Sequence, residues 1–331
     1  MSQLGISMCG TKHSHSAGIL MSVLKDDRVN FKGVYEPDNS RKEYLKDLDT
    51  NPWNQVTWID SEDDLLFDNQ TQAVIVEAGN HESLDFVDKL IRSGKHVFSD
   101  KPAGEDYEKF VKIIDIAKKN HLFLQLGYMF RYHNGFSLIA DWARTGMLGQ
   151  IFSIRAHMST NHRSNLPSAE RISKHHVGGV YFDLSGHMID QIVWILGRPE
   201  KITSFLRDDT SILKGFVDNT LSVFEFHSSI ATIDISASET VPTARRFEVY
   251  GTNGSAIMEP MEPPGKIRLC LDKKFEGFHS GENFIQVANI PRYDAMMSAF
   301  LDDVIGEKSP DRSLDHELLV QETLLRSTGV I

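Results

Sequence analysis

The sequence predicts an α/β protein of two domains: a doubly wound parallel sheet at the N-terminus, then an α+β domain with a large, open, mostly antiparallel sheet. At 331 residues the chain is long for a single hydrophobic core. Up to about residue 126, short apolar runs alternate with helical patterns, which is typical of a parallel sheet with crossover helices. Beyond that point, several apolar runs follow one another without helices between them. We therefore expect one domain over residues 1–126 and another over residues 127–331.

The first domain is expected to begin with a strand, a turn and a helix. The apolar run from Leu4 to Cys9 ends at Gly10, and a helical pattern covers about Ser14 to Leu24. Further strands and helices alternate after it. The remaining expected strands are 31–36, 74–76, 96–98 and 122–126, and the remaining helical patterns cover about 84–91 and 109–119.

The second domain is expected to hold few helices and many strands. Helical patterns cover about 135–145, 181–196 and 293–305, and the strands are 201–206, 220–227, 231–237, 246–250 and 255–258. Polar and apolar residues alternate imperfectly over 222–227, as expected when one sheet face is covered. Because the helices are too few to cover both faces, we expect the other face to pair with a second subunit in a homodimer or homotetramer.

Composition restricts the class of partner. The net charge of −11 argues against binding to a nucleic-acid backbone or to an anionic membrane. No apolar run approaches the ~18 residues of a membrane span, and the N-terminus lacks the pattern of an export signal. Cys9 and Cys270 lie far apart and match no metal-binding spacing. These features predict a cytoplasmic protein that acts on a small molecule.

The turn after the first strand carries an incomplete dinucleotide-binding pattern. Only Gly10 of the usual three glycines is present, because Met8 and His13 occupy the other two positions. His13 and His15 either face a ligand or lie in a solvated helix start. Glu36 follows 26 residues after Gly10, where an acid accepts hydrogen bonds from ribose hydroxyls and repels a 2′-phosphate. This favours NAD over NADP, although an acid before a proline is also common in loops.

A second polar pattern lies in the helix expected at 181–196. Asp183, His187 and Asp190 are spaced by four and three residues, which places them on one helical face. Two flanking acids would hold the imidazole and raise its basicity, as suits a proton acceptor near neutral pH. The alternative is a polar stripe that faces water.

Several short motifs resemble those of the Gfo/Idh/MocA oxidoreductases, in the order of that family. Asp100-Lys101-Pro102 resembles the family's Glu-Lys-Pro motif, and Gly79-Asn80-His81 resembles its Pro-Asn-His turn. Asp183 and His187 match an aspartate and a histidine four residues later, and Asp190 matches a further acid. The remaining matches are Gly127-Tyr128-Met129-Phe130-Arg131-Tyr132, Leu148-Gly149-Gln150-Ile151 and the closing stretch 293–325.

The resemblance implies a Rossmann domain and NAD(P)-dependent transfer of a hydride to or from a secondary hydroxyl of a sugar, polyol or related compound. It places Lys101 beside the nicotinamide and makes Lys101, Asp183 and His187 the catalytic residues. The chain departs from the family in its degenerate glycine turn, in Met129 and in the order of Ser185 and Gly186. The cofactor-binding residues expected are Gly10, Thr11, Lys12, His13, Glu36, Asn80, His81, Asp100 and Lys101.

Residue chemistry suggests a role for each catalytic residue. His187 would accept the proton of the substrate hydroxyl, Asp183 would orient it, and Lys101 would stabilise the developing alkoxide. Lys101 itself is an alternative proton acceptor. Arg131, His162 and His176 are expected to contact substrate together with Asp183 and His187.

Two other functions remain open at this point. The degenerate glycine turn also suits a non-redox protein on the same fold, which senses a sugar or retains NAD without net turnover. The histidines at 175 and 176, with Asp183 and His187, suggest a metal-dependent lyase or epimerase. Because adjacent histidines rarely bind one ion together, we predict no metal here.

Overall fold

The computed structural model describes residues 3–306 and 310–331. The chain divides into two compact units, one of residues 1–128 with 291–318 and one of residues 129–290 with 319–331. The first break lies two residues beyond the expected boundary at 126. Residues 291–318 were expected in the second domain, but they belong to the first unit.

The first unit contains a six-stranded parallel sheet, as predicted. The strand order β3-β2-β1-β4-β5-β6 reverses between β1 and β4, which is the place where doubly wound sheets bind ligands. β1 and β4 are buried along their whole length, and this explains their uninterrupted apolar character. The strands are β1 (Leu4–Cys9), β2 (Val29–Tyr35), β3 (Trp58–Ile59), β4 (Ala73–Val76), β5 (His96–Ser99) and β6 (Leu124–Leu126).

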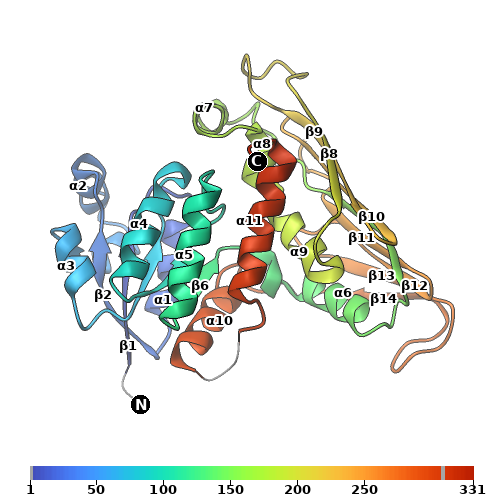
Figure 1. Ribbon diagram of the computed structural model, residues 1–331, viewed down its shortest axis with the longest axis horizontal. Coiled ribbons are helices and arrows are strands. Elements are labelled where there is room, and N and C mark those ends of the chain that lie inside the picture. The colour runs from blue at the N-terminus through green and yellow to red at the C-terminus, as the bar shows by residue number, and fades with distance from the viewer. Residues whose placement is uncertain (1–2, 307–309) are drawn as a thin grey trace. The chain divides into compact units, whose positions relative to one another are not determined.

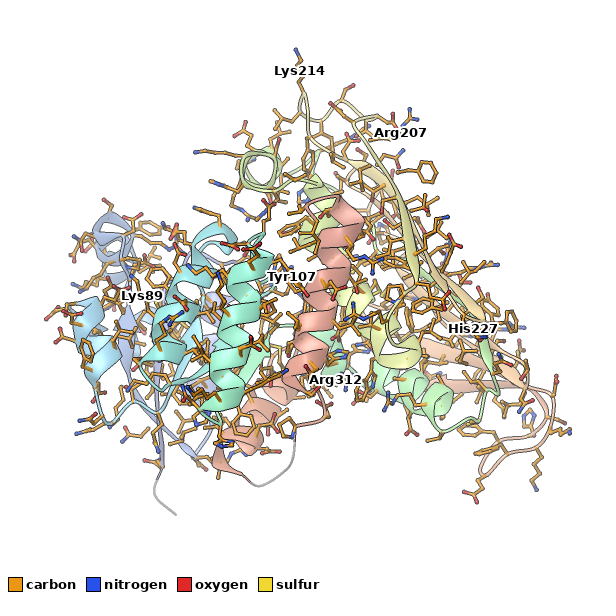
Figure 2. All side chains as sticks on the ribbon, in the orientation of Figure 1. Lys89, Tyr107, Arg207, Lys214, His227 and Arg312 are labelled. Carbon is orange, nitrogen blue, oxygen red and sulfur yellow. The ribbon has the colours of Figure 1, made fainter. Side chains whose placement is uncertain are left out.

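Helices connect these strands and cover the sheet, with α4 and α5 side by side on one face (Figure 1). On α4, Lys89 extends to the carboxylate of Glu62 at the start of α3, 2.8 Å away (Figure 2). α1 begins at Ser16, two residues later than expected. The helices are α1 (Ser16–Leu24), α2 (Asn39–Asp47), α3 (Glu62–Phe67), α4 (Asn80–Arg92) and α5 (Tyr107–Lys119).

α10 (Asp294–Ile305) belongs to the first unit because its side chains pack on α1 and the sheet. Ser22 donates a hydrogen bond to Asp294 at 2.7 Å, and Arg28 forms an ion pair with Asp302. The ring of Phe300 meets that of Phe98 edge to face at 5.9 Å. These contacts are long-range in sequence, so helical periodicity alone placed this helix in the wrong domain.

The second unit is an eight-stranded sheet covered on one face by helices, which confirms the predicted fold class. Its order is β14-β13-β12-β11-β7-β10-β9-β8, and only the β7–β10 pairing among these strands is parallel. The strands are β7 (Ile151–His157), β8 (Lys201–Arg207), β9 (Asn219–Phe226), β10 (Ser229–Ser236), β11 (Arg246–Gly251), β12 (Gly254–Met258), β13 (Lys266–Leu271) and β14 (Gly281–Gln286).

The helices α6, α8 and α9 pack against the inner face of this sheet (Figure 1). On the outer face, Phe205 and Leu221 are paired across β8 and β9 and are exposed, as is Ile230 on β10. The label of Arg207 in Figure 2 marks the end of β8. The helices are α6 (Asn134–Arg144), α7 (Leu166–His175), α8 (Gly179–Leu184), α9 (Gly186–Leu196) and the part of α11 (Leu314–Thr328) from Leu319 onward.

Several elements differ from the sequence expectations. The single helix expected at 181–196 is two helices that meet at Ser185, and α2, α3, α7 and α11 were not predicted. The short strand β3 and the strands β7, β13 and β14 were also missed. Among the described residues, no helix combines the length and apolar character needed to cross a membrane.

Candidate functional site

The turn between β1 and α1 lies against the turn that follows β4. Gly10 has a φ of +76°, and a Cβ at this position would lie 2.7 Å from the Cα of Ala78. Only glycine combines this backbone conformation with so close an approach. Gly10 therefore forms a tight turn that another residue would strain, although Met8 and His13 replace the other glycines of the pattern.

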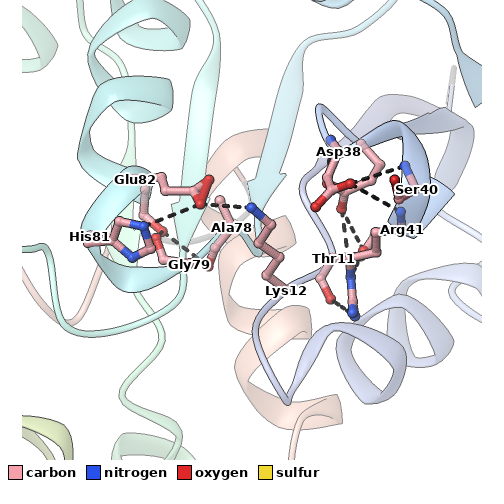
Figure 3. A network of polar contacts seen from close by, with 11 residues as sticks. Thr11, Lys12, Asp38, Ser40, Arg41, Ala78, Gly79, His81 and Glu82 are labelled. Atoms are coloured by element: carbon pink, nitrogen blue, oxygen red, sulfur yellow. Dashed lines mark hydrogen bonds and ion pairs between the residues drawn. The ribbon is translucent and has the colours of Figure 1, made fainter. Parts of the chain in front are cut away.

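Glu36 follows directly after β2 and is held by the glycine turn. Its carboxylate accepts hydrogen bonds from the Thr11 hydroxyl at 2.6 Å and from the backbone N–H of Asp38 at 3.0 Å. Arg41, which sequence reasoning missed, donates to the Thr11 hydroxyl at 2.6 Å and lies 4.0 Å from Glu36 (Figure 3). The sequence signal for Arg41 was a basic residue in the first turn of α2, three residues after the N-cap residue Asp38.

The N-terminus of α4 faces the same turn. Lys12 donates to Glu82 at 2.9 Å, and this hydrogen bond raises the pKa of Lys12. His81 lies 3.4 Å from the same carboxylate (Figure 3). Asn80 is buried, and its amide nitrogen has no hydrogen-bond partner among the described residues. An orphaned donor at a helix N-terminus, beside the Gly10 turn, fits a bound pyrophosphate or ribose. The residues present therefore fit a dinucleotide.

Two histidines in the β1–α1 turn meet two buried acids. The Nδ1 atoms of His13 and His15 lie 2.9 and 2.7 Å from the same oxygen, Oδ2 of Asp100. Oε2 of Glu77 lies 3.7 Å from Nδ1 of His13. Burial raises the pKa of Glu77, and the adjacent Asp100 adds to this. Burial acts in the same direction on Asp100, but His13 and His15 hold the pKa of Asp100 well below its usual range.

Lys101 follows Asp100 immediately after β5 and is buried rather than solvated. Its backbone N–H donates to Oδ1 of Asp100 at 2.7 Å. The lysine and the acid of the Asp100-Lys101-Pro102 motif thus lie at the carboxyl end of a parallel strand, where ligands bind in such sheets.

In the second unit, Asp183 and His187 lie on α8 and α9 on either side of Ser185, which keeps helical dihedral angles. Asp183 is half-buried and His187 is buried. The ring of Phe130 lies 5.1 Å from that of His187. This arrangement does not support the polar-stripe alternative for His187.

Asp190 and Arg131 form a buried ion pair in the second unit. Nη2 of Arg131 lies 2.8 Å from Oδ1 of Asp190, and both side chains are 0% exposed. The acid that was expected to hold His187 is therefore bound to Arg131. The same pair argues against a contact between Arg131 and a substrate carboxylate.

His162 and His176 lie near these helices in the second unit. Burial lowers the pKa of His162, and the charge of Asp183 opposes this effect. Nε2 of His162 has no hydrogen-bond partner among the described residues, whereas the His176 ring stacks on Phe182 at 4.6 Å. Within the described residues, the ligand atoms of His175, His176, Asp183 and His187 do not form a metal-binding group.

A surface hollow of about 490 Å³ lies elsewhere in the second unit. Arg144, Leu196, Phe226 and His227 contribute to its lining, and none of the expected site residues does. The hollow therefore adds nothing to the assignment of the catalytic residues.

Comparison with known sequences decides the family. The sequence model of the NAD-binding Rossmann-fold oxidoreductases matches residues 4–128, and that of the GFO/IDH/MocA C-terminal domain matches residues 136–257. The chain belongs to the Gfo/Idh/MocA family. The predicted resemblance is thereby confirmed.

Individual Gfo/Idh/MocA relatives share low sequence identity with this chain. The chain is 30% identical over 209 residues to scyllo-inositol 2-dehydrogenase (NAD(+)) of Bacillus subtilis, covering 61% of this chain and 59% of the relative. It is 26% identical over 253 residues to 2,7-anhydro-N-acetylneuraminate hydratase of Escherichia coli, covering 73% and 64%. GenD2 from gentamicin A biosynthesis, solved in complex with NAD, superposes with a TM-score of 0.80 at 20% identity, covering 99% and 95%. The matches span 56–59% of the length of the first three curated relatives.

Proposed function

We propose that this protein is an NAD-dependent dehydrogenase that oxidises a secondary hydroxyl of a sugar, inositol or related polyol, or catalyses the reverse reduction. The observation that carries the proposal is the buried His187, one helical turn from the half-buried Asp183, in a member of the Gfo/Idh/MocA family. The inositol dehydrogenase among its relatives supports the substrate class.

The chain's own residues supply the proton chemistry. NAD, when bound, accepts the hydride from the carbinol carbon. An imidazole nitrogen of His187 takes the proton from the hydroxyl, since imidazole titrates near ~6.5. Asp183 orients the hydroxyl or the ring, and the ammonium of Lys101 stabilises the negative charge on oxygen. Lys101 remains the alternative proton acceptor, and the two are distinguished by single-turnover rates of their alanine variants.

The cofactor-binding surface comprises Gly10, Thr11, Glu36, Asn80 and the N-terminus of α4. We propose that NAD is preferred over NADP because the Glu36 carboxylate opposes a 2′-phosphate. Arg41 is the residue that would accept such a phosphate if Glu36 were removed. Calorimetric titration should show that Glu36→Ala gains affinity for NADP while Glu36→Ala/Arg41→Ala does not. Tighter binding of NADP than NAD by the unaltered protein would contradict the preference.

The exposed outer sheet face is proposed as a subunit interface. Phe205, Leu221 and Ile230 place apolar surface on neighbouring strands without a covering helix among the described residues. We expect a homodimer or homotetramer, and Phe205→Glu should shift it toward monomer in sedimentation velocity. The control is Lys214→Glu, because Lys214 lies in the loop between β8 and β9, away from the exposed apolar strands (Figure 2). A 37.4 kDa species for the unaltered protein at micromolar concentration would count against the interface.

The deciding experiment is a screen of sugars, inositols and sugar acids with NAD and NADP, following the absorbance of reduced nicotinamide. A second candidate, an enzyme that retains NAD without net turnover, is favoured by the hydratase among the relatives. It predicts NAD bound in the purified protein and product formation without net change in that absorbance. Substrate-dependent NADH accumulation over many turnovers supports the dehydrogenase and excludes this second function.

A further inference from the structure

We propose that His13, His15 and Asp100, with the buried Glu77 beside them, form a binding site for one divalent transition-metal ion, with zinc as the reference ion. These four residues, called here the turn cluster, follow the carboxyl ends of the adjacent parallel strands β1, β4 and β5. The site lies entirely within the first unit. It goes beyond the dehydrogenase function and does not depend on it.

The geometry of the donor atoms is the first argument. The ligand atoms of His13, His15 and Asp100 all lie within 4.8 Å of one another, and both Nδ1 atoms lie within 2.9 Å of Asp100 Oδ2. A zinc ion requires distances of about 2.0–2.2 Å to each nitrogen and oxygen donor. The three donor atoms therefore need to move apart by less than about 1 Å to admit the ion. The N–H of Lys101 fixes the other oxygen of Asp100, in the way that outer hydrogen bonds orient metal ligands.

Glu77 provides the second, independent argument. Its side chain is 0% exposed, and neither carboxylate oxygen has a hydrogen-bond partner among the described residues. A buried acid in this state is costly unless it is neutralised or bound to a cation. Oε2 of Glu77 lies 3.7 Å from the Nδ1 of His13, next to the three donor atoms, so a cation held there would also offset its charge.

The charges select the class of ion. Two neutral imidazoles and two carboxylates carry a charge of −2, which one divalent cation neutralises in a buried site. Imidazole donors favour zinc and its first-row neighbours over magnesium or calcium, which prefer oxygen ligands. The Tyr293 ring packs beside His15 with 5.3 Å between ring centroids and helps to limit access of water to the turn cluster.

The turn cluster differs from the contact that His157 makes with two acids in the second unit. His157 also meets two acids, but Asp234 bonds to Nδ1 and Glu239 bonds to Nε2, on opposite sides of the ring. Donors so arranged do not surround one point. His157 therefore offers a matched control, a partly buried histidine whose loss should not affect metal binding.

The test is zinc titration of the full-length protein after treatment with a chelator, in competition with a chromophoric zinc ligand and without NAD. We expect one equivalent of zinc per chain. His15→Asn should weaken affinity by at least the roughly 10–100-fold typical of altered outer contacts, and His13→Asn/His15→Asn should abolish binding. His157→Asn should bind as the unaltered protein does. Failure of the unaltered protein to bind zinc, or equal affinity in His15→Asn, would overturn the proposal.

A measurement on the unaltered chain guards against variants that do not fold. Cobalt substitution should give the visible absorption of a low-symmetry site, and X-ray absorption of the zinc form should show two imidazole ligands and no sulfur. A zinc spectrum without imidazole scattering would refute the site. Because no cofactor or substrate is present, these results are independent of the dehydrogenase assay.

Discussion

The turn cluster in the first unit and the α8–α9 segment in the second unit both combine histidines with acids, but the acids have different partners. In the turn cluster, two imidazoles share one oxygen of Asp100, and Glu77 lies beside them without a donor. On α9, Asp190 forms an ion pair with Arg131, and both side chains are 0% exposed. The comparison shows that acids near histidines differ in their partners: Asp100 lies against two imidazoles, Asp190 pairs with Arg131, and His157 binds two acids on opposite sides of its ring.

The largest expected effect is on turnover. His187→Ala should lower kcat by about 10²–10⁴-fold if His187 is the general base, with little change in NAD affinity. His157→Ala should leave kcat nearly unchanged. Single-turnover rates and calorimetric NAD titration with an identified substrate check this. Near-normal kcat in His187→Ala would remove it from the mechanism and leave Lys101 as the base.

The next effect concerns the buried ion pair of Arg131 and Asp190. Arg131→Met leaves a buried carboxylate without its cation and should lower the free energy of unfolding by about 3–5 kcal/mol. The double variant Arg131→Met/Asp190→Leu should recover most of this loss, because an apolar pair needs no neutralisation. Urea unfolding of the single and double variants measures both. Equal loss in both would show that the pair's charges are not the reason for the destabilisation.

The smallest expected effect concerns His157, whose two ring nitrogens bond to two different acids, Asp234 and Glu239. The hydrogen bond to Asp234 raises the pKa of His157, with a further contribution from Glu239. A histidine with a raised folded-state pKa stabilises the fold fully below its unfolded pKa of about 6.5, and the effect disappears as pH rises through the folded value.

His157→Gln should therefore lower the free energy of unfolding by about 0.5–1 kcal/mol at acidic pH and by less at alkaline pH. His227→Gln is the control, since the His227 side chain is 96% exposed (Figure 2). Unfolding in urea at several pH values tests this. A pH-independent loss would mean that the ring contributes packing rather than charge.

Local patterns were sufficient for much of the fold. The apolar runs Leu4–Cys9 and Ala73–Val76 are buried strands of the parallel sheet. Burial alternates along β9 as one covered face requires, but its buried positions include the polar Thr220 and Ser222. The motif residues Gly10, Glu36, Asn80, Asp100 and Lys101 all lie at the carboxyl ends of parallel strands or in the turns after them. Each of these features depends on neighbours in sequence, where periodicity and turn chemistry are informative.

The sequence by itself determined the two-sheet architecture, the family and the candidate positions Lys101, Asp183 and His187. Tertiary structure alone decided that 291–318 packs in the first unit, that Arg131 binds Asp190 and that Arg41 contacts Thr11. It alone also brought Glu77 and Asp100 to His13 and His15. Strands β1, β4 and β5 are far apart in sequence but adjacent in the sheet, so their carboxyl ends meet only when the sheet forms. Contacts of that kind depend on the pairing of distant strands, which no local spacing encodes.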